Sequence, residues 1–155
     1  MSIEITYLKH HPQHVSILAS WAFNMWGHYN PESTLERFVA KIEQHLNEDC
    51  LPLTYIALCN NKPVGMSSLR NADGIRPDLS PWLGSLFVHP DYRHQGIGEK
   101  LIATVITKAK EMHYSKLYLL AFDEILPLWY QRLGWKFIGI DEVYTHPVSV
   151  MEIGV

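Results

Sequence analysis

The sequence contains only two cysteines, Cys50 and Cys59, and their spacing matches no metal-binding or redox motif. We therefore expect both to be reduced thiols of a cytoplasmic protein. No apolar run approaches the ~18 residues that a membrane-spanning helix needs. The first residues also lack the basic segment followed by an apolar core that marks a signal peptide. These scarcities predict a cytoplasmic protein with no membrane partner.

Positive charge is also scarce. Lysine and arginine total 13 against 16 acidic residues, a formal net charge of −3, which argues against nucleic acid as a partner. His10, His11 and His14 lie close together, but no carboxylate or cysteine completes a ligand set and Pro12 interrupts the segment, so we expect no metal site. The 155 residues, 47% of them hydrophobic, suit one globular domain over 1–155.

Hydrophobic periodicity predicts an alternation of strands and helices. Strands are expected at Ile3–Leu8, Leu53–Cys59, Val64–Leu69, Trp82–Val88, Lys116–Ala121, Trp135–Ile140 and Val148–Ile153. Helices are expected from near Pro12, after a capping box of Ser33 and Glu36, after the glycines near residue 97, and over Ile125–Leu133. The order β-α-α-β-β-β-α-β-α-β-β predicts an α/β fold with a mixed central β-sheet flanked by about four helices.

A glycine-containing loop joins the strand Trp82–Val88 to the helix that follows. The loop carries Arg93, and Gly96 and Gly98 open the helix. Such glycines leave backbone N–H groups bare at a helix N-terminus, where a phosphate or pyrophosphate binds. This stretch therefore predicts a phosphate-binding loop.

Two other glycine-loop motifs fail on spacing. A dinucleotide fingerprint needs a third glycine where Leu101 stands. A P-loop needs lysine and then serine or threonine after its last glycine, but Gly98 is followed by Glu99 and Lys100. A nucleotide-binding domain of either type is therefore disfavoured.

The loop resembles the acyl-CoA pyrophosphate loop of the GNAT family of N-acetyltransferases, whose signature is Gln/Arg-x-x-Gly-x-Gly/Ala. The resemblance implies that acetyl-CoA places its pyrophosphate on the amides from Gln95 to Glu99. The cofactor-binding residues it implies in the loop are Arg93, His94, Gln95, Gly96, Ile97, Gly98 and Glu99. In the preceding strand, backbone groups of Leu86, Phe87 and Val88 would hold the pantetheine arm and polarise the thioester carbonyl.

A second segment, Leu128–Trp135, is similar to the Tyr-x-x-x-Gly-Phe segment of the same family, with Trp135 in place of phenylalanine. The resemblance gives Tyr130 the role of protonating the leaving thiolate. Relatives often carry an asparagine that contacts pantetheine seven residues before this tyrosine. Here Asp123 stands at that spacing, and an ionised aspartate accepts hydrogen bonds but cannot donate them.

The sequence defines the residues that bind and activate the acceptor less clearly than those that bind the cofactor. Ser85, the polar residue of the strand before the loop, is no base but could position a water that serves one. The candidates for the base itself stay open: Asp73, Asp78, His89, Glu142 and His146. The resemblance places the acceptor pocket at the first two helices and their connection, which brings in Trp26, His28 and Tyr29, together with Trp82.

These features predict an acetyl-CoA-dependent N-acetyltransferase that moves an acetyl group directly to a primary amine. The acceptor would be a small-molecule or peptide amine: a metabolite, an antibiotic or a protein amine. The alternative is a catalytically silent acyl-CoA-binding sensor, which the presence of Tyr130 disfavours and the missing base keeps open. The sequence leaves open whether the chain forms a homodimer.

Overall fold

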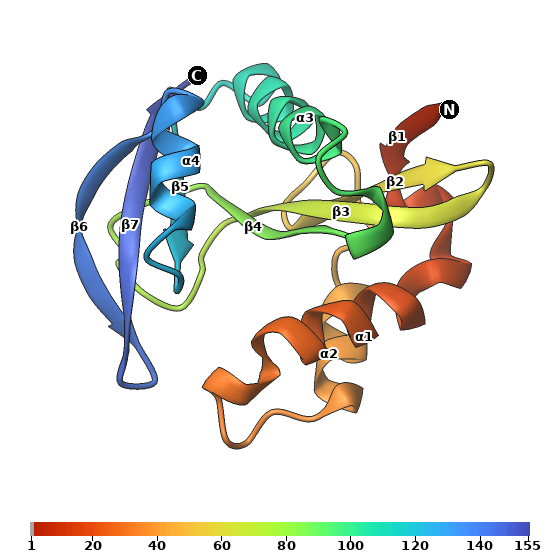
Figure 1. Cartoon of the computed structure of the whole chain (residues 1–155), viewed down its shortest axis with the longest axis horizontal. Helices are drawn as coiled ribbons and strands as arrows, with labels where there is room; N and C mark the ends of the chain where they lie inside the picture. Colours follow the sequence, from red (N-terminus) through yellow and green to blue (C-terminus); the bar gives the residue numbers. More distant parts are fainter. Residues whose placement is uncertain (1) are drawn as a thin grey trace.

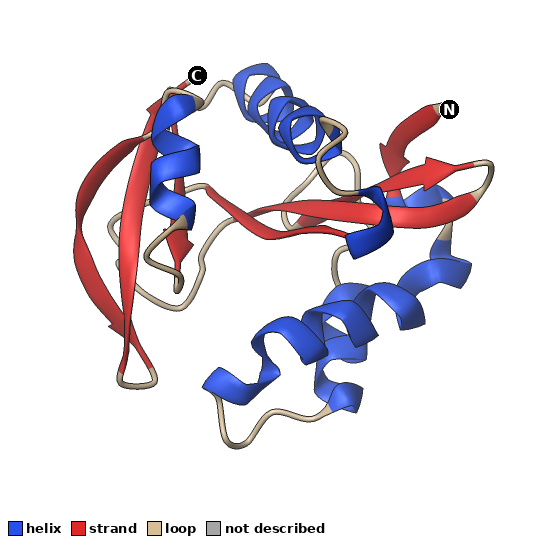
Figure 2. Ribbon diagram, viewed as in Figure 1, coloured by secondary structure: helices blue, strands red, loops and turns tan. Residues whose placement is uncertain are grey.

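A computed structural model describes residues 2–155, in which helices cover both faces of one β-sheet (Figures 1 and 2). The strands are β1 Ile3–Tyr7, β2 Leu53–Cys59, β3 Lys62–Arg70, β4 Trp82–Val88, β5 Lys116–Ala121, β6 Lys136–Val143 and β7 His146–Gly154. The α-helices are α1 Val15–Trp26, α2 Leu35–Glu43, α3 Ile97–Glu111 and α4 Leu126–Arg132. The predicted mixed α/β fold is confirmed.

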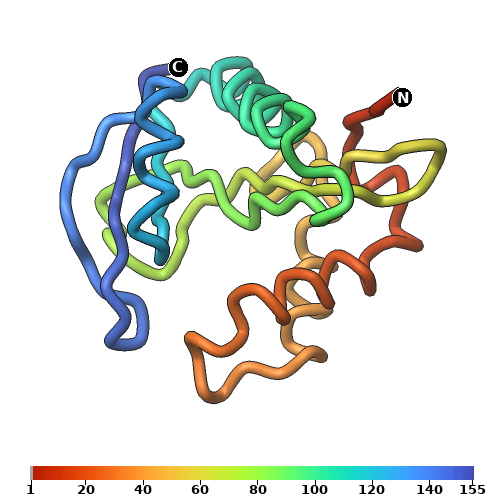
Figure 3. The backbone as a smooth tube through the Cα atoms, in the orientation of Figure 1, coloured from red at the N-terminus to blue at the C-terminus, as the bar shows by residue number. Residues whose placement is uncertain are grey.

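The sheet has the strand order β1-β2-β3-β4-β5-β7-β6, and β4 and β5 are its only parallel neighbours among the described residues. These two strands pair only at Trp82 and Tyr118. Beyond that point they diverge, and the backbone trace separates into a β1–β4 half and a β5–β7 half (Figure 3). The backbone groups of β4 that face β5 therefore have no strand partner along most of their length.

A β-bulge interrupts β4 where the two strands diverge. Phe87 pairs with Met66 and Gly84 pairs with Ser68, so β4 contains one residue more than β3 over this stretch. Ser85 takes up the irregularity with a φ of 48°. A bulge bends its strand and redirects side chains, so β4 turns away from β5 here.

Hydrophobic residues pack on both faces of the sheet. In β2, Tyr55 and Ala57 belong to the core beneath α3 and α4, whereas Ile56 and Leu58 belong to the core beneath α1 and α2. This alternation with a period of two is why β2 is buried on both sides. Figure 1 shows α3 above β3 and β4, with α1 and α2 below them.

The predicted cap of α2 is wrong by one residue. Thr34 is the N-cap, and its Oγ1 accepts a hydrogen bond of 3.2 Å from the amide of Arg37. Ser33 instead donates its hydroxyl to the carbonyl of Gly27. Serine and threonine can both cap a helix. Because the hydroxyl of Ser33 is hydrogen-bonded to Gly27, Thr34 serves as the cap. Within residues 2–155 no helix has the length and apolar character needed to cross a membrane.

Two leucine substitutions in helices test this packing. Leu101 on α3 is fully buried and Leu128 on α4 is 57% exposed. We expect Leu101→Ala to lower the free energy of unfolding by about 3 kcal/mol, because it removes buried area and leaves a cavity. Leu128→Ala should cost less than ~1 kcal/mol. Urea denaturation measures both, and equal losses would contradict the described core.

Candidate active site

The glycine loop forms the N-terminus of α3. Gly96 is the N-cap, with a φ of 80° that an L side chain rarely adopts. The amide of Lys100 donates to the carbonyl of Gly96 at 3.2 Å and starts the helical hydrogen bonding. The amides of Ile97, Gly98 and Glu99 precede it and have no helical acceptor. They are suited to bind an anion such as a pyrophosphate.

Gly98 lies where the glycine loop packs against α4. A Cβ added at this position would lie 3.4 Å from the indole ring of Trp129, so the loop and α4 pack closely here. Trp129 in turn contacts Tyr130, with 5.0 Å between ring centroids. The loop and the tyrosine, which lie far apart in the sequence, are thus positioned by one aromatic contact.

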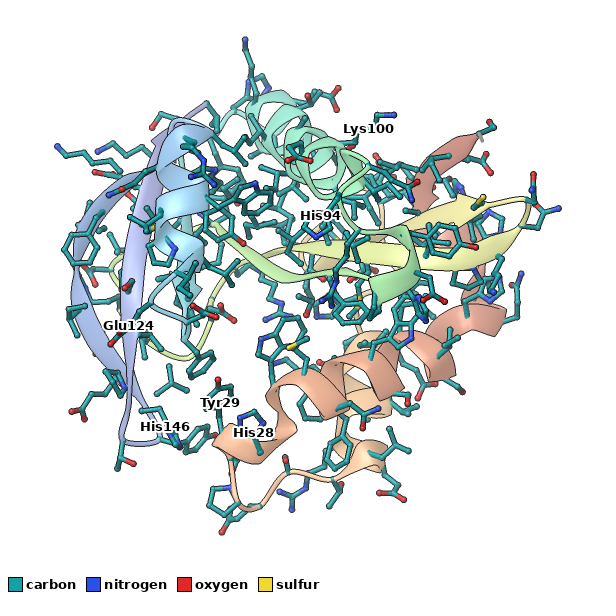
Figure 4. All side chains as sticks on the ribbon, in the orientation of Figure 1. His28, Tyr29, His94, Lys100, Glu124 and His146 are labelled. Atoms are coloured by element: carbon teal, nitrogen blue, oxygen red, sulfur yellow. The ribbon has the colours of Figure 1, made fainter. Side chains whose placement is uncertain are left out.

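Arg93 attaches the loop to β4. Its Nε donates to the carbonyl of Val88 at 2.9 Å, and its guanidinium lies 5.6 Å from the ring centroid of Phe87. His94 and Gln95 are exposed, and Figure 4 shows His94 beside the beginning of α3. Arg93 therefore holds the loop against the last residues of the strand.

A cavity of about 730 Å³ lies on the other side of the diverging strands. Six of the residues predicted for the site line it: Trp26, Tyr29, Ser85, Leu86, Asp123 and Tyr130. They come from α1 and its following turn, from β4, and from the segment between β5 and the end of α4. The cavity therefore connects the first two helices with the opening between β4 and β5.

Trp82 and His28 do not line this cavity. Trp82 is fully buried, with its Nε1 donating to the carbonyl of Leu79 at 2.8 Å, and it packs against Tyr118 where β4 and β5 still pair. His28 is exposed and lies against Tyr29, with 4.0 Å between ring centroids. Trp82 supports the sheet at this point, so we do not assign it to the acceptor pocket.

An aromatic contact closes one end of the cavity. Tyr29 stacks on Phe122, with ring centroids 3.7 Å apart and planes inclined by 9°. His146 meets the same tyrosine edge-on at 5.1 Å. Figure 4 shows Tyr29, His28 and His146 between the end of α1 and the turn joining β6 to β7. The sequence pattern did not single out Phe122, because only the folded chain brings it to Tyr29.

Tyr130 is 7% exposed and forms part of the cavity wall. Burial raises the pKa of its phenol well above the ordinary value. The hydroxyl consequently stays protonated at neutral and mildly alkaline pH. A protonated hydroxyl at a cavity wall is suited to donate a hydrogen bond or a proton to a reacting group.

The five candidates for the general base differ in whether they line the cavity. Three of them do not line the cavity: Asp78, His89 and His146. Asp78 instead forms an ion pair with Arg76. Asp73 lines the cavity, but its carboxylate accepts from Arg70 Nη1 at 2.7 Å. Glu142 also lines it and forms no ion pair within residues 2–155.

Two predicted polar residues of the wall already have partners. Asp123 accepts a hydrogen bond from the amide of Ile125, two residues along, in the turn that precedes α4. The hydroxyl of Ser85 accepts from Arg70 Nη2. The serine therefore keeps its own proton available for a water or a substrate atom.

The sequence analysis missed four basic residues of the cavity: Arg37 and Lys41 on α2, His45 just after it, and Arg70 at the end of β3. His45 hydrogen-bonds through Nδ1 to Thr54 Oγ1 at 2.9 Å. Burial, followed by the charges of Arg70 and Lys41, lowers the pKa of His45 to about 3. The imidazole is therefore neutral at physiological pH and too weak a base to deprotonate an amine.

A helix N-terminus suited to bind an anion lies beside two diverging strands, with a tyrosine on the wall of the adjoining cavity, as the resemblance to the GNAT acetyltransferases predicts. The sequence profile of the Acetyltransferase (GNAT) family matches residues 15–135, and the chain belongs to this family. It is accordingly an acetyltransferase.

Two solved structures of acetyltransferases have the same fold. The PaiA N-acetyltransferase of Thermoplasma acidophilum, solved with coenzyme A, superposes over 100% of both chains with a TM-score of 0.72 and 22% identity. An acetyltransferase from Streptococcus agalactiae covers 99% of this chain and 98% of its own, with a TM-score of 0.73 and 19% identity.

A curated relative matches a shorter stretch of sequence. The amino-acid acetyltransferase of Buchnera aphidicola subsp. Acyrthosiphon pisum is 32% identical over 59 residues. The match covers 38% of this chain and 13% of that protein. This likeness therefore concerns only a small part of the relative.

A charge placed at the N-cap of α3 tests the pyrophosphate site. In Gly96→Asp the carboxylate would occupy the same amides and repel a phosphate, so affinity for CoA should fall by about tenfold or more. Gly96→Ala separates the backbone strain from the charge. Gly154→Asp, at an open position on β7, controls for the added charge. Calorimetry that found unchanged CoA affinity in Gly96→Asp would refute the assignment.

Proposed function

We propose that the chain is an N-acetyltransferase that moves the acetyl group of acetyl-CoA directly to a primary amine. The observation that carries the proposal is the cavity itself, because one wall holds Tyr130 and another holds Ser85 and Leu86 of the diverging strand. A cavity of about 730 Å³ accommodates a small molecule. A donor in the opening and an acceptor in the cavity would meet beside Tyr130.

The donor would span two parts of the structure. Its pyrophosphate would bind the amides of Ile97 to Glu99, and its pantetheine arm would lie along the unpaired backbone of β4. A backbone N–H of this strand would polarise the thioester carbonyl and stabilise the charge that develops on its oxygen. The side chains of Leu86 and Val88 would pack, with only their backbone taking part.

The amine must lose a proton before it attacks. An alkyl ammonium with a pKa of ~10.4 is neutral in only about one molecule in 2,500 at pH 7. Glu142 is our candidate for the base, directly or through water, since it faces the cavity without an ion pair. Ser85 would position that water. The neutral amine then attacks the thioester carbon, and the tetrahedral intermediate expels the CoA thiolate.

Tyr130 would protonate the departing thiolate. A thiol has a pKa of ~8.5 and an ordinary phenol ~10, so the transfer is uphill by about 2 kcal/mol, and burial of the phenol increases this difference. For an ordinary phenol this cost of about 2 kcal/mol is modest beside a catalytic barrier, and burial adds to it. Proton exchange with water restores the phenol afterwards.

A thiol-release assay across a panel of amines tests the proposed reaction. Acetyl-CoA turnover that depends on an added amine, with the acetyl amide found by mass spectrometry, would support it. Tight CoA binding with no turnover on any amine would favour a silent acyl-CoA-binding module instead.

Tyr130→Phe should lower kcat by about 100-fold, the usual scale for the loss of a general acid. CoA affinity and the far-UV spectrum should not change. Tyr118→Phe is the matched control, because Tyr118 is also buried but does not line the cavity. A kcat that stayed constant in Tyr130→Phe, with chemistry limiting turnover, would remove the acid role.

The same assay gives a pH profile. Because the pKa of Tyr130 is raised, its acid form persists through the mildly alkaline range, and the rate should rise with pH as the amine deprotonates. A fall in rate below pH 9 caused by loss of the phenol proton would be inconsistent with a buried acid.

Direct transfer predicts that no cysteine carries the acetyl group. Cys50 is exposed, Cys59 is buried in β2, and neither lines the cavity. The double variant Cys50→Ala/Cys59→Ala should therefore keep most of the wild-type activity, and initial-rate plots should intersect. Parallel lines, or an acetylated enzyme that passes its acetyl group to the amine at a competent rate, would show a covalent intermediate.

A further inference from the structure

The cavity contains a concentration of positive charge on one side. Lys41 of α2 and Arg70 of β3 both line it, together with Arg37, which lies one turn before Lys41 on the same helix. Arg37 is exposed and donates to the carbonyl of Glu32. Arg70 contacts Ser85 of β4, and its charge acts on Lys41 in the same cavity.

Arg70 is held rigidly at the β4 bulge. Its guanidinium lies so close to Gly84 that an added Cβ would be 2.6 Å from Cζ. Nη1 donates to Asp73 and Nη2 to Ser85. Nε is buried and has no hydrogen-bond partner within residues 2–155. A buried donor without a partner costs stability, so the packing around Nε keeps the guanidinium in place at the cost of this unmade bond.

Lys41 supplies a positive charge that no carboxylate neutralises. It forms no ion pair within residues 2–155, and it is exposed to the solvent of the open cavity. The charge of Arg70, followed by burial, lowers the pKa of Lys41, and Asp73 offsets this only in part. Two cations that repel each other in one cavity would both gain from a bound anion.

The free donors and the apolar lining of the cavity favour a carboxylate over a phosphate as the bound anion. Nη1 and Nη2 of Arg70 each use one N–H for Asp73 and Ser85 and keep a second one, whereas Nε is covered by protein atoms. These second N–H groups and the ammonium of Lys41 are the donors that remain for a ligand. Because Asp73 already pairs with Arg70, the site has less excess positive charge than a dianionic phosphate would need. The rest of the lining includes Met25, Phe38 and Ile42, which suit an apolar portion of the ligand.

We propose that the acceptor is an amine that also carries a carboxylate, and that Lys41 and Arg70 bind this carboxylate beside the β4 bulge. This inference rests on the proposed function and names its substrate class. Because Arg70 contacts Ser85 where the strands diverge, a bound carboxylate would lie near the thioester. The amine would then be separated from it by a short chain, as in an amino acid with an apolar side chain.

Matched acceptors test the proposal. L-Phenylalanine and L-leucine are compared with L-phenylalaninamide and L-leucinamide, which keep the amine and the apolar group but lose the carboxylate. Because neutral amides have a larger fraction of free amine, rates are compared per neutral amine. We expect kcat/KM on that basis to be at least tenfold higher for the amino acids.

Substitutions of Lys41 test whether this residue binds the carboxylate. Lys41→Met should lower kcat/KM for the amino acids by about tenfold, mainly through KM, and leave the amides unaffected. Lys41→Arg should restore much of the loss. Lys110→Met, an exposed helical lysine outside the cavity, is the control. Better turnover of the amides in the wild type, or an equal loss for both acceptor classes in Lys41→Met, would overturn the proposal.

Failure of the proposed function gives a different result. If no acceptor of either class is acetylated, the reaction itself is refuted, and the carboxylate site is judged by calorimetry with L-phenylalanine and L-leucine. Binding that Lys41→Met weakens would still support the site. An absence of binding to the wild-type protein, with and without CoA, would overturn it.

Discussion

The divergence of β4 from β5 is the feature on which the rest of the site depends. The two strands pair at Trp82 and Tyr118 and nowhere else. Further pairing would satisfy the backbone of β4 within the sheet and leave no space for a pantetheine arm. The bulge at Ser85 bends β4 at the same place. One irregularity in the sheet thus provides both an opening for the donor and a wall for the acceptor cavity.

Two contacts hold the proposed catalytic groups relative to this opening. The indole of Trp129 lies against Gly98, which ties α4 and Tyr130 to the phosphate-binding end of α3. On the other side, Arg70 reaches the bulge and binds Ser85. The donor site and the acceptor cavity are consequently positioned from opposite faces of the same strand, and a shift of β4 would disturb both.

Local motifs could be predicted from the sequence, whereas contacts between distant segments could not. The glycine loop depends on adjacent residues, and the strand limits of β2, β4 and β5 follow from local hydrophobic runs. Lys41 and Arg70 carry no such signal, because a lysine on the polar face of α2 resembles any solvated residue. Trp82 was expected near the acceptor from its aromatic type, but its place at the β4–β5 pair buries it completely.

The account's central claim is that acetyl-CoA occupies the opening between β4 and β5. A crystal structure of the complex tests this most directly. We predict phosphate oxygens about 3 Å from the amides of Ile97 to Glu99. The thioester should lie beside β4 and face the cavity that Tyr130 lines. A pyrophosphate bound away from α3, or β4 and β5 paired along their length with the thioester elsewhere, would contradict the account.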